Sequence, residues 1–204
     1  MSQHNYFEIL ELPIQPFVDE AVLKANYLKL SSIVHPDRET SNSVQETALV
    51  DASLVNEAQR TLSHTPSRLK HLLTLRTGSA PGNLRHVPNA IGDLFMEVGV
   101  LLQKMDAVIK EKPSEDASEL SRVLFLKKSM VYRQQTESIL QKINEGIDHL
   151  QTQLESLNED WQKVMTKDAL PPDFAQKMIQ LYHEWTFHDR WQGQLRDRLL
   201  ELTV

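Results

Sequence analysis

The chain has 204 residues, a formal net charge of −6 and no cysteine, and 40% of its residues are hydrophobic. The acidic charge argues against a general nucleic-acid binder, and the lack of cysteine excludes disulfides and thiolate metal sites. No stretch approaches the roughly 20 consecutive apolar residues of a membrane span, and the first residues do not resemble a secretory signal. We therefore expect a cytoplasmic protein without a nucleic-acid or membrane partner.

The composition and the apolar spacing favour an all-α fold. There are only 6 glycines, and apolar residues recur at steps of three and four rather than in alternation. Gly, Pro, Ser and Asn gather between two helical regions, which predicts a linker at residues 77–90. We expect an N-terminal domain at 1–76 and a C-terminal helical domain at 91–204.

The first region begins with two helices. A short helix, NYFEILEL, ends at Pro13. The next helix has four apolar residues on one face: Leu23, Tyr27, Leu30 and Val34. It cannot continue through Pro36, because proline lacks an N–H and restricts the residue before it.

Two more helices complete this region. Ser43 and Glu46 have the spacing of a capping box, which predicts that a third helix begins there. Its apolar stripe consists of Ala48, Ala52, Val55 and Leu62, with Leu49 alongside. A short fourth helix follows Pro66. We expect two antiparallel helices joined by a loop that contains the tripeptide HPD, residues 35–37, with short helices at either end.

The second region predicts an antiparallel three-helix bundle. Its first helix is IGDLFMEVGVLLQKMDAVIKE. A long helix follows, with an unbroken apolar seam of Leu140, Ile143, Ile147, Leu150, Leu154, Leu157, Trp161 and Val164. Gly146 lies beside this seam, where a bend is one interpretation. The last helix has a matching stripe of Phe174, Met178, Leu181, Trp185, Leu195, Leu199 and Leu202.

The first region resembles a J-domain, whose hallmark is His-Pro-Asp between two antiparallel helices. More specifically, it is similar to HscB-type J-protein co-chaperones of iron–sulfur cluster assembly. The segments that carry the resemblance are YFEIL-ELP, HPDR, VNEAQRTL and TPSRLKHLLTLRTG. The resemblance covers about the first 78 residues, and the second region fits the family's C-terminal bundle in length and character.

The resemblance implies that the chain binds a DnaK/HscA-type heat-shock chaperone and stimulates its ATPase. His35, Pro36 and Asp37 would make the contact: Pro36 stiffens the loop, and Asp37 can accept a charge-assisted hydrogen bond. Lys24 and Lys29 would add positive charge, although they point in different directions.

The basic face of the helix before the loop is thin. Ser31 and Ser32 stand where longer polar or basic side chains are common, and Arg38 is the nearest compensating charge. We therefore expect modest electrostatic steering of the chaperone.

The resemblance also implies a client, an IscU-type iron–sulfur scaffold. Phe95, Met96 and Glu97 correspond to the family's client-binding run on the first bundle helix, with Phe95 in place of the usual Leu, and Tyr182 is the candidate aromatic on the last helix. The sequence also departs from the family at Gly99, Val100 and Gln103, where the family has Leu, Glu and Glu. Core packing is the competing interpretation, and we favour it for Leu101 and Leu102.

No residue is expected to be catalytic, to bind a metal or to hold a cofactor. His183 and His188 in HEWTFH are five residues apart, so they diverge on a helix and do not form a zinc-protease pair. There is no glycine-rich phosphate loop, so the ATPase chemistry belongs to the partner. Two alternatives stay open: a J-protein with another client, and a helical oligomerisation scaffold with a vestigial HPD tripeptide.

Overall fold

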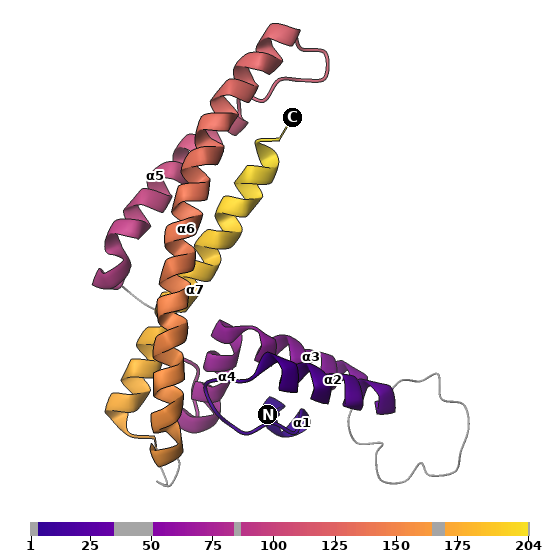
Figure 1. Ribbon diagram of the computed structural model, residues 1–204, viewed down its shortest axis with the longest axis vertical. Coiled ribbons are helices and arrows are strands. Elements are labelled where there is room, and N and C mark those ends of the chain that lie inside the picture. The colour runs from indigo at the N-terminus through magenta and orange to yellow at the C-terminus, as the bar shows by residue number, and fades with distance from the viewer. Residues whose placement is uncertain (1–3, 35–50, 84–86, 165–169, 204) are drawn as a thin grey trace, which may run out of the picture. The chain divides into compact units, whose positions relative to one another are not determined.

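The computed structural model describes residues 4–34, 51–83, 87–164 and 170–203, which contain helices and no strand (Figure 1). The elements are α1 (Tyr6–Ile9), α2 (Glu20–Val34), α3 (Ala52–Ser63), α4 (Thr65–Thr77), a 3₁₀ turn (Asn89–Ile91), α5 (Gly92–Ile109), α6 (Glu119–Val164) and α7 (Pro172–Glu201). The predicted all-α fold is confirmed.

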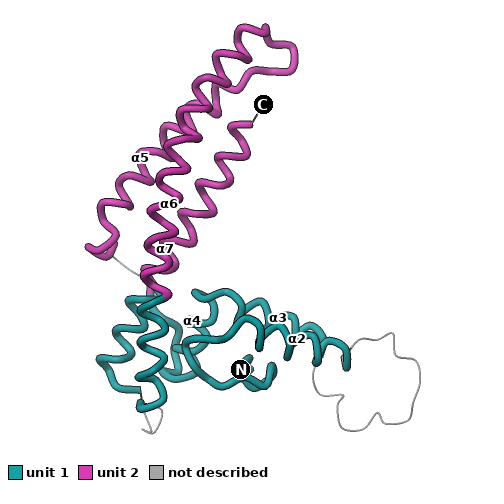
Figure 2. The backbone as a smooth tube through the Cα atoms, in the orientation of Figure 1, with its two compact units in different colours: residues 1–82, 152–182 teal, residues 83–151, 183–204 magenta. Residues whose placement is uncertain are grey.

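The chain forms two compact units (Figure 2). Unit 1 comprises residues 1–82 and 152–182, and unit 2 comprises residues 83–151 and 183–204. Both α6 and α7 therefore contribute residues to each unit. Residues 152–182, which we assigned to the C-terminal domain, cluster with the N-terminal ones, and the domain boundaries stay a prediction.

In unit 1, α2 and α3 form the expected antiparallel hairpin and lie side by side (Figure 1). The Tyr27 hydroxyl donates to the Asn56 side chain across the pair, at 2.9 Å. The capping box predicted at residues 43–46 lies outside the described residues. The described helix α3 begins at Ala52, and Asp51 caps it by accepting from the Ser53 N–H at 2.9 Å.

The buried face of α3 differs in part from the predicted stripe. Val55 and Leu62 are buried as expected, and Ala58 is buried with them. Ala52 is exposed, because it occupies the first turn, beyond the end of the packed face.

The core of unit 1 includes side chains that are distant in sequence. Phe7, Leu10, Leu62, Leu69, Leu72 and Leu73 are fully buried, and so is Trp161 of α6. The Trp161 indole N–H donates to the Ile14 carbonyl at 2.7 Å. Phe174 of α7 packs against the Trp161 ring, with 5.9 Å between the ring centres.

A buried arginine, Arg68, donates hydrogen bonds both to the α3–α4 corner and to the segment before α2. The Arg68 guanidinium donates to the carbonyls of Pro16 and Leu62, at 3.0 and 2.6 Å, and to the Thr65 hydroxyl at 3.0 Å. Burial lowers the pKa of Arg68 to about 10, although Glu20 acts in the opposite direction. Since buried carbonyls need partners, Arg68 is a structural residue of unit 1.

In unit 2, α5, α6 and α7 share one apolar core, as the bundle prediction requires. Met105, Ile143 and Leu195 are its fully buried members from the three helices. The predicted seam of α6 is confirmed over both units: Ile143, Leu150, Leu154 and Trp161 are buried, and the other four members are half-buried.

Gly146 of α6 lies against His188 of α7. A Cβ at this position would lie 2.9 Å from Cδ2 of His188 and closer still to Nε2. His188 is buried, and its Nδ1 is 2.9 Å from the Glu184 carbonyl. The α6 helix is unbroken from Glu119 to Val164, so Gly146 serves a close approach between helices.

Candidate partner-binding surfaces

The HPD tripeptide and Arg38 lie outside the described residues, between the end of α2 and the start of α3. The structure does place two other predicted chaperone contacts, Lys24 and Lys29, on the exposed surface of α2. Lys29 pairs with Glu11 at 2.6 Å. Lys24 makes no ion pair or hydrogen bond within the described part of the chain. An exposed pair such as Lys29–Glu11 is weak, so both lysines remain accessible to a partner.

The predicted client residues on α5 are exposed. The Phe95 side chain is 40% exposed, and its ring contacts the rings of Phe187 and Trp191 at 6.2 to 6.5 Å between centres. Met96 is 63% exposed. Leu101 is buried and Leu102 half-buried, as the core interpretation expects.

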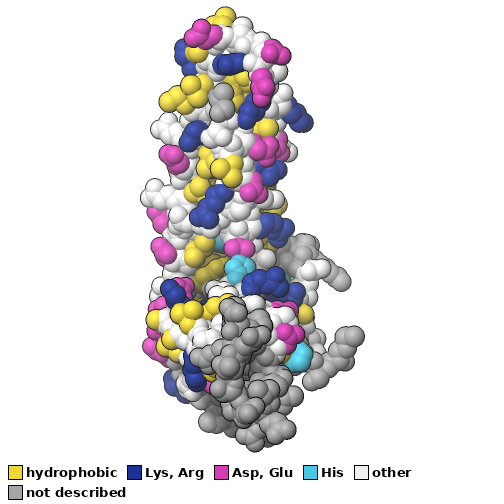
Figure 3. Space-filling view, turned by 90° about the vertical axis from the view of Figure 1, so that its right-hand side faces the viewer, with side chains coloured by type: hydrophobic (Ala, Val, Ile, Leu, Met, Phe, Trp, Pro, Cys, Tyr) yellow, Lys and Arg dark blue, Asp and Glu magenta, His cyan; other side chains and the backbone are white. Residues whose placement is uncertain are grey.

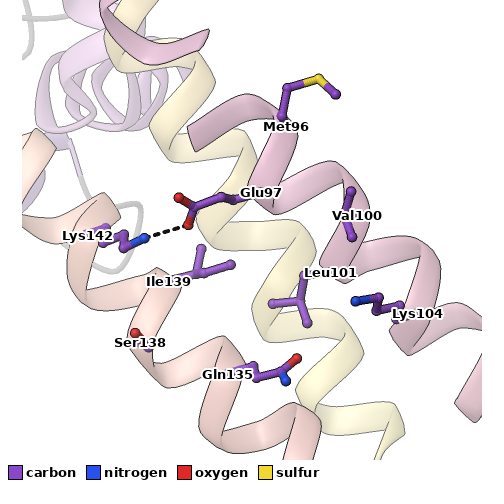
Figure 4. A pocket seen from close by; sticks show the side chains of 9 residues that line it. All are labelled: Met96, Glu97, Val100, Leu101, Lys104, Gln135, Ser138, Ile139 and Lys142. Carbon is purple, nitrogen blue, oxygen red and sulfur yellow. Dashed lines mark hydrogen bonds and ion pairs between the residues drawn. The ribbon is translucent and has the colours of Figure 1, made fainter. Parts of the chain in front are cut away.

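Acidic and basic side chains alternate with hydrophobic patches over the face shown in Figure 3. Against this mixed surface, one hollow in unit 2 is distinctly apolar. It is a groove of about 500 Å³ between α5 and α6 (Figure 4). From α5 it is lined by Met96, Glu97, Val100, Leu101 and Lys104. From α6 it is lined by Gln135, Ser138, Ile139 and Lys142.

The charges at the groove are unequal. Glu97 and Lys142 form an ion pair across it, at 2.6 Å, with both side chains about half exposed. Figure 4 shows the Lys104 side chain pointing toward the space between the helices. Lys104 has no ion pair or hydrogen bond with any described residue. The groove therefore combines an apolar floor with one unneutralised positive charge.

The structure brings together some of the predicted client residues. Met96 and Glu97 share the groove, and Phe95 lies beside them on α5. Tyr182 is half-buried and belongs to unit 1, whereas the other three belong to unit 2.

Sequence reasoning missed the α6 side of the groove. Lys104 and Lys142 were not among the predicted site residues. The signal in the sequence is indirect: Gln135, Ser138 and Lys142 follow one another at steps of three and four on the side of α6 away from its seam.

The described residues do not form a metal site or a pair of metal-binding histidines. No group of three His, Asp or Glu residues there is arranged to hold a metal ion. His188 is buried and His183 half-buried, and burial lowers the pKa of His183. None of the described helices has both the length and the apolar character of a membrane span.

Comparison with known proteins gives a consistent class. No family model matches the chain. The co-chaperone protein HscB homolog of Acinetobacter baumannii is 39% identical over 101 residues, which is 49% of this chain and 54% of that protein. The homolog of Haemophilus influenzae is 38% identical over 76 residues, 36% of this chain and 44% of that protein. The chain thus spans about half the length of the curated relatives it matches.

The fold comparison extends over nearly the whole chain. Chaperone HscB from Vibrio cholerae has a TM-score of 0.56 at 19% identity, covering 96% of this chain and 99% of that one. Human co-chaperone protein HscB has a TM-score of 0.54 at 17% identity, covering 95% and 81%. The fold is therefore all-α, a helical hairpin followed by a bundle, and it is similar to the fold of the two HscB structures. The sequence relatives are HscB co-chaperones, so the chain is similar to HscB-type proteins over the matched residues.

Proposed function

We propose that this protein is a J-domain co-chaperone that binds a DnaK/HscA-type chaperone, stimulates its ATPase and delivers a client. The observation that carries the proposal is the HscB-like fold over 96% of the chain, with the HPD tripeptide following directly on α2. The ATPase chemistry belongs to the partner.

The chaperone contact would combine the loop with the exposed face of α2. Asp37 would accept a hydrogen bond from a cationic side chain of the chaperone, and Lys24 would meet its carboxylates. Lys29 is already paired with Glu11, so it contributes less than Lys24.

The test is ATPase stimulation of a DnaK-type chaperone by the full chain and by His35→Gln. We expect the variant to lose stimulation by about tenfold or more, which corresponds to one docking anchor of about 1.4 kcal/mol. His4→Gln makes the same change at an exposed histidine and serves as the matched control. A folded His35→Gln variant that stimulates as well as wild type contradicts the proposal.

The proposed client is an IscU-type iron–sulfur scaffold, which would bind at Phe95, Met96 and Glu97. Met96 suits an adaptable apolar contact because it is unbranched, polarizable and exposed. A binding assay with such a scaffold should show weaker binding for Phe95→Ala and Met96→Ala. If wild type does not bind the scaffold, the client is a different protein, an alternative favoured by the positive charge of Lys104 at the groove.

A further inference from the structure

The groove continues as a row of side chains along one side of α6. Leu120, Leu124, Lys127 and Val131 precede Gln135, Ser138 and Lys142 at steps of three or four residues. This spacing places all seven on the same side of the helix, and we call them the α6 row. The last three line the groove, so groove and row form one continuous surface of unit 2. The row covers 22 residue steps, or about 33 Å of helix.

The apolar members of the α6 row are exposed. Leu120, Leu124 and Val131 are 68%, 52% and 54% exposed, respectively. The opposite side of the same helix is packed, with Phe125 and Ser129 buried. This part of α6 therefore has apolar residues on both sides, and only one side is covered within the described chain. Contiguous apolar surface of this kind marks an interaction site.

The charge of this surface opposes that of the whole chain. Groove and row together contain three lysines, Lys104, Lys127 and Lys142, and one carboxylate, Glu97, so their net charge is +2. The chain as a whole carries −6. Lys142 is neutralised by Glu97, whereas Lys104 and Lys127 make no ion pair or hydrogen bond with the described residues.

We propose that the groove and the α6 row bind an acidic amphipathic helix of a partner protein. Its apolar side chains would lie on Leu120, Leu124 and Val131 and enter the groove at Met96, and its carboxylates would pair with Lys104 and Lys127. Spacing at three and four residues along a straight apolar strip is the surface that a helix in a groove requires. The inference rests on the proposed function, in which this face of the bundle holds the client.

Two other occupants fit less well. A second copy of the same surface would set the lysines of one face against those of the other, which is unfavourable. An anionic membrane would favour the lysines, but a flat bilayer surface would not fill a groove between two helices.

The experiment uses the full chain and a displayed library of helical peptides of about 20 residues, long enough to follow the row. Leucines are fixed at three-to-four spacing, and the flanking positions are varied among Glu, Gln and Lys. We expect wild type to enrich Glu over Lys by about tenfold, because carboxylates pair with the two lysines. Lys104→Glu/Lys127→Glu should abolish or invert this preference. Lys70→Glu, an exposed charge reversal on α4 in unit 1, should keep it.

The enriched peptide then tests the apolar strip. Its affinity should fall by about fivefold or more for Leu124→Ser and Val131→Ser, measured by fluorescence anisotropy. The inference is rejected by a library without enrichment, by a preference for Lys, or by an unchanged preference in the double variant. It is also rejected if Leu124→Ser abolishes binding to phosphatidylglycerol vesicles or breaks a dimer seen by light scattering, since the row would then have another occupant.

The outcome is separable from that of the ATPase assay. If wild type does not stimulate the ATPase but still prefers acidic peptides, the co-chaperone function is rejected and the acidic-helix site is kept. Stimulation without a peptide preference would reject the site alone.

Discussion

Gly146→Ala should destabilise the protein, although alanine is normally the better helix residue. In an open helix interior the exchange stabilises by about 1 kcal/mol. Here the new methyl group would lie 2.9 Å from Cδ2 of His188 and still closer to Nε2. His188 cannot easily move, because it is buried, lies beside the Glu184 carbonyl and contacts the Trp191 ring at 5.5 Å between centres. Overpacking of a core costs about 1–3 kcal/mol. If the cost here is about 3 kcal/mol and the helix gains about 1 kcal/mol, the free energy of unfolding falls by about 2 kcal/mol.

Urea unfolding followed by circular dichroism measures the loss, and Gly99→Ala is the matched control. Gly99 is in the interior of α5, and a Cβ there meets nothing within 4 Å, so this variant should be stabilised by up to about 1 kcal/mol. Adding His188→Ala to Gly146→Ala should remove the clash, so the two losses should be less than additive. If Gly146→Ala is as stable as Gly99→Ala, the close approach of α6 and α7 at this point is wrong.

Two further predictions concern unit 1. Arg68→Met should lower the free energy of unfolding by about 2–4 kcal/mol, because the Pro16 and Leu62 carbonyls lose their donor. Arg60→Met, at an exposed position, is the control and should change the free energy of unfolding little. Equal urea midpoints for the two variants would refute the structural role of Arg68. His71 accepts from the Tyr6 N–H through Nε2 at 3.1 Å, and burial lowers its pKa. Its neutral form therefore stabilises the fold above the unfolded pKa of about 6.5, and this stability is lost as the pH falls below that value, by at most about 1.4 kcal/mol per pH unit. Unfolding at a series of pH values should show a smaller slope for His71→Gln, and an NMR titration midpoint of His71 above about 6.5 would contradict the assignment.

Periodicity in the sequence was sufficient for the α6 seam, whereas on α3 it predicted only part of the buried face. The α6 seam needed no tertiary information, since steps of three and four residues alone place Ile143, Leu150 and Leu154 on one side. The exposed position of Met96 could not be derived in this way, because an apolar residue at helical spacing fits a core as well as a surface.

Features that depend on two distant segments were not predictable. Arg68 reads as an ordinary surface charge in sequence, and only the carbonyls of Pro16 and Leu62 make it a buried residue. The groove likewise requires α5 and α6 to meet at Glu97 and Lys142, which are 45 residues apart. Local propensity carries no information about such pairs.

The contact between Trp161 and the Ile14 carbonyl joins residues 147 positions apart, and this separation governs the order in which unit 1 can close on the ribosome. At about 5–20 residues per second, the indole emerges about 7–30 s after the carbonyl that it caps. During that interval α1 to α4 must hold together without the part of α6 that completes their core. The hairpin that precedes and follows the HPD tripeptide is thus synthesised long before its cover. In a nascent chain of this protein, the residues that we propose to bind the chaperone therefore belong to a domain whose core is not yet complete.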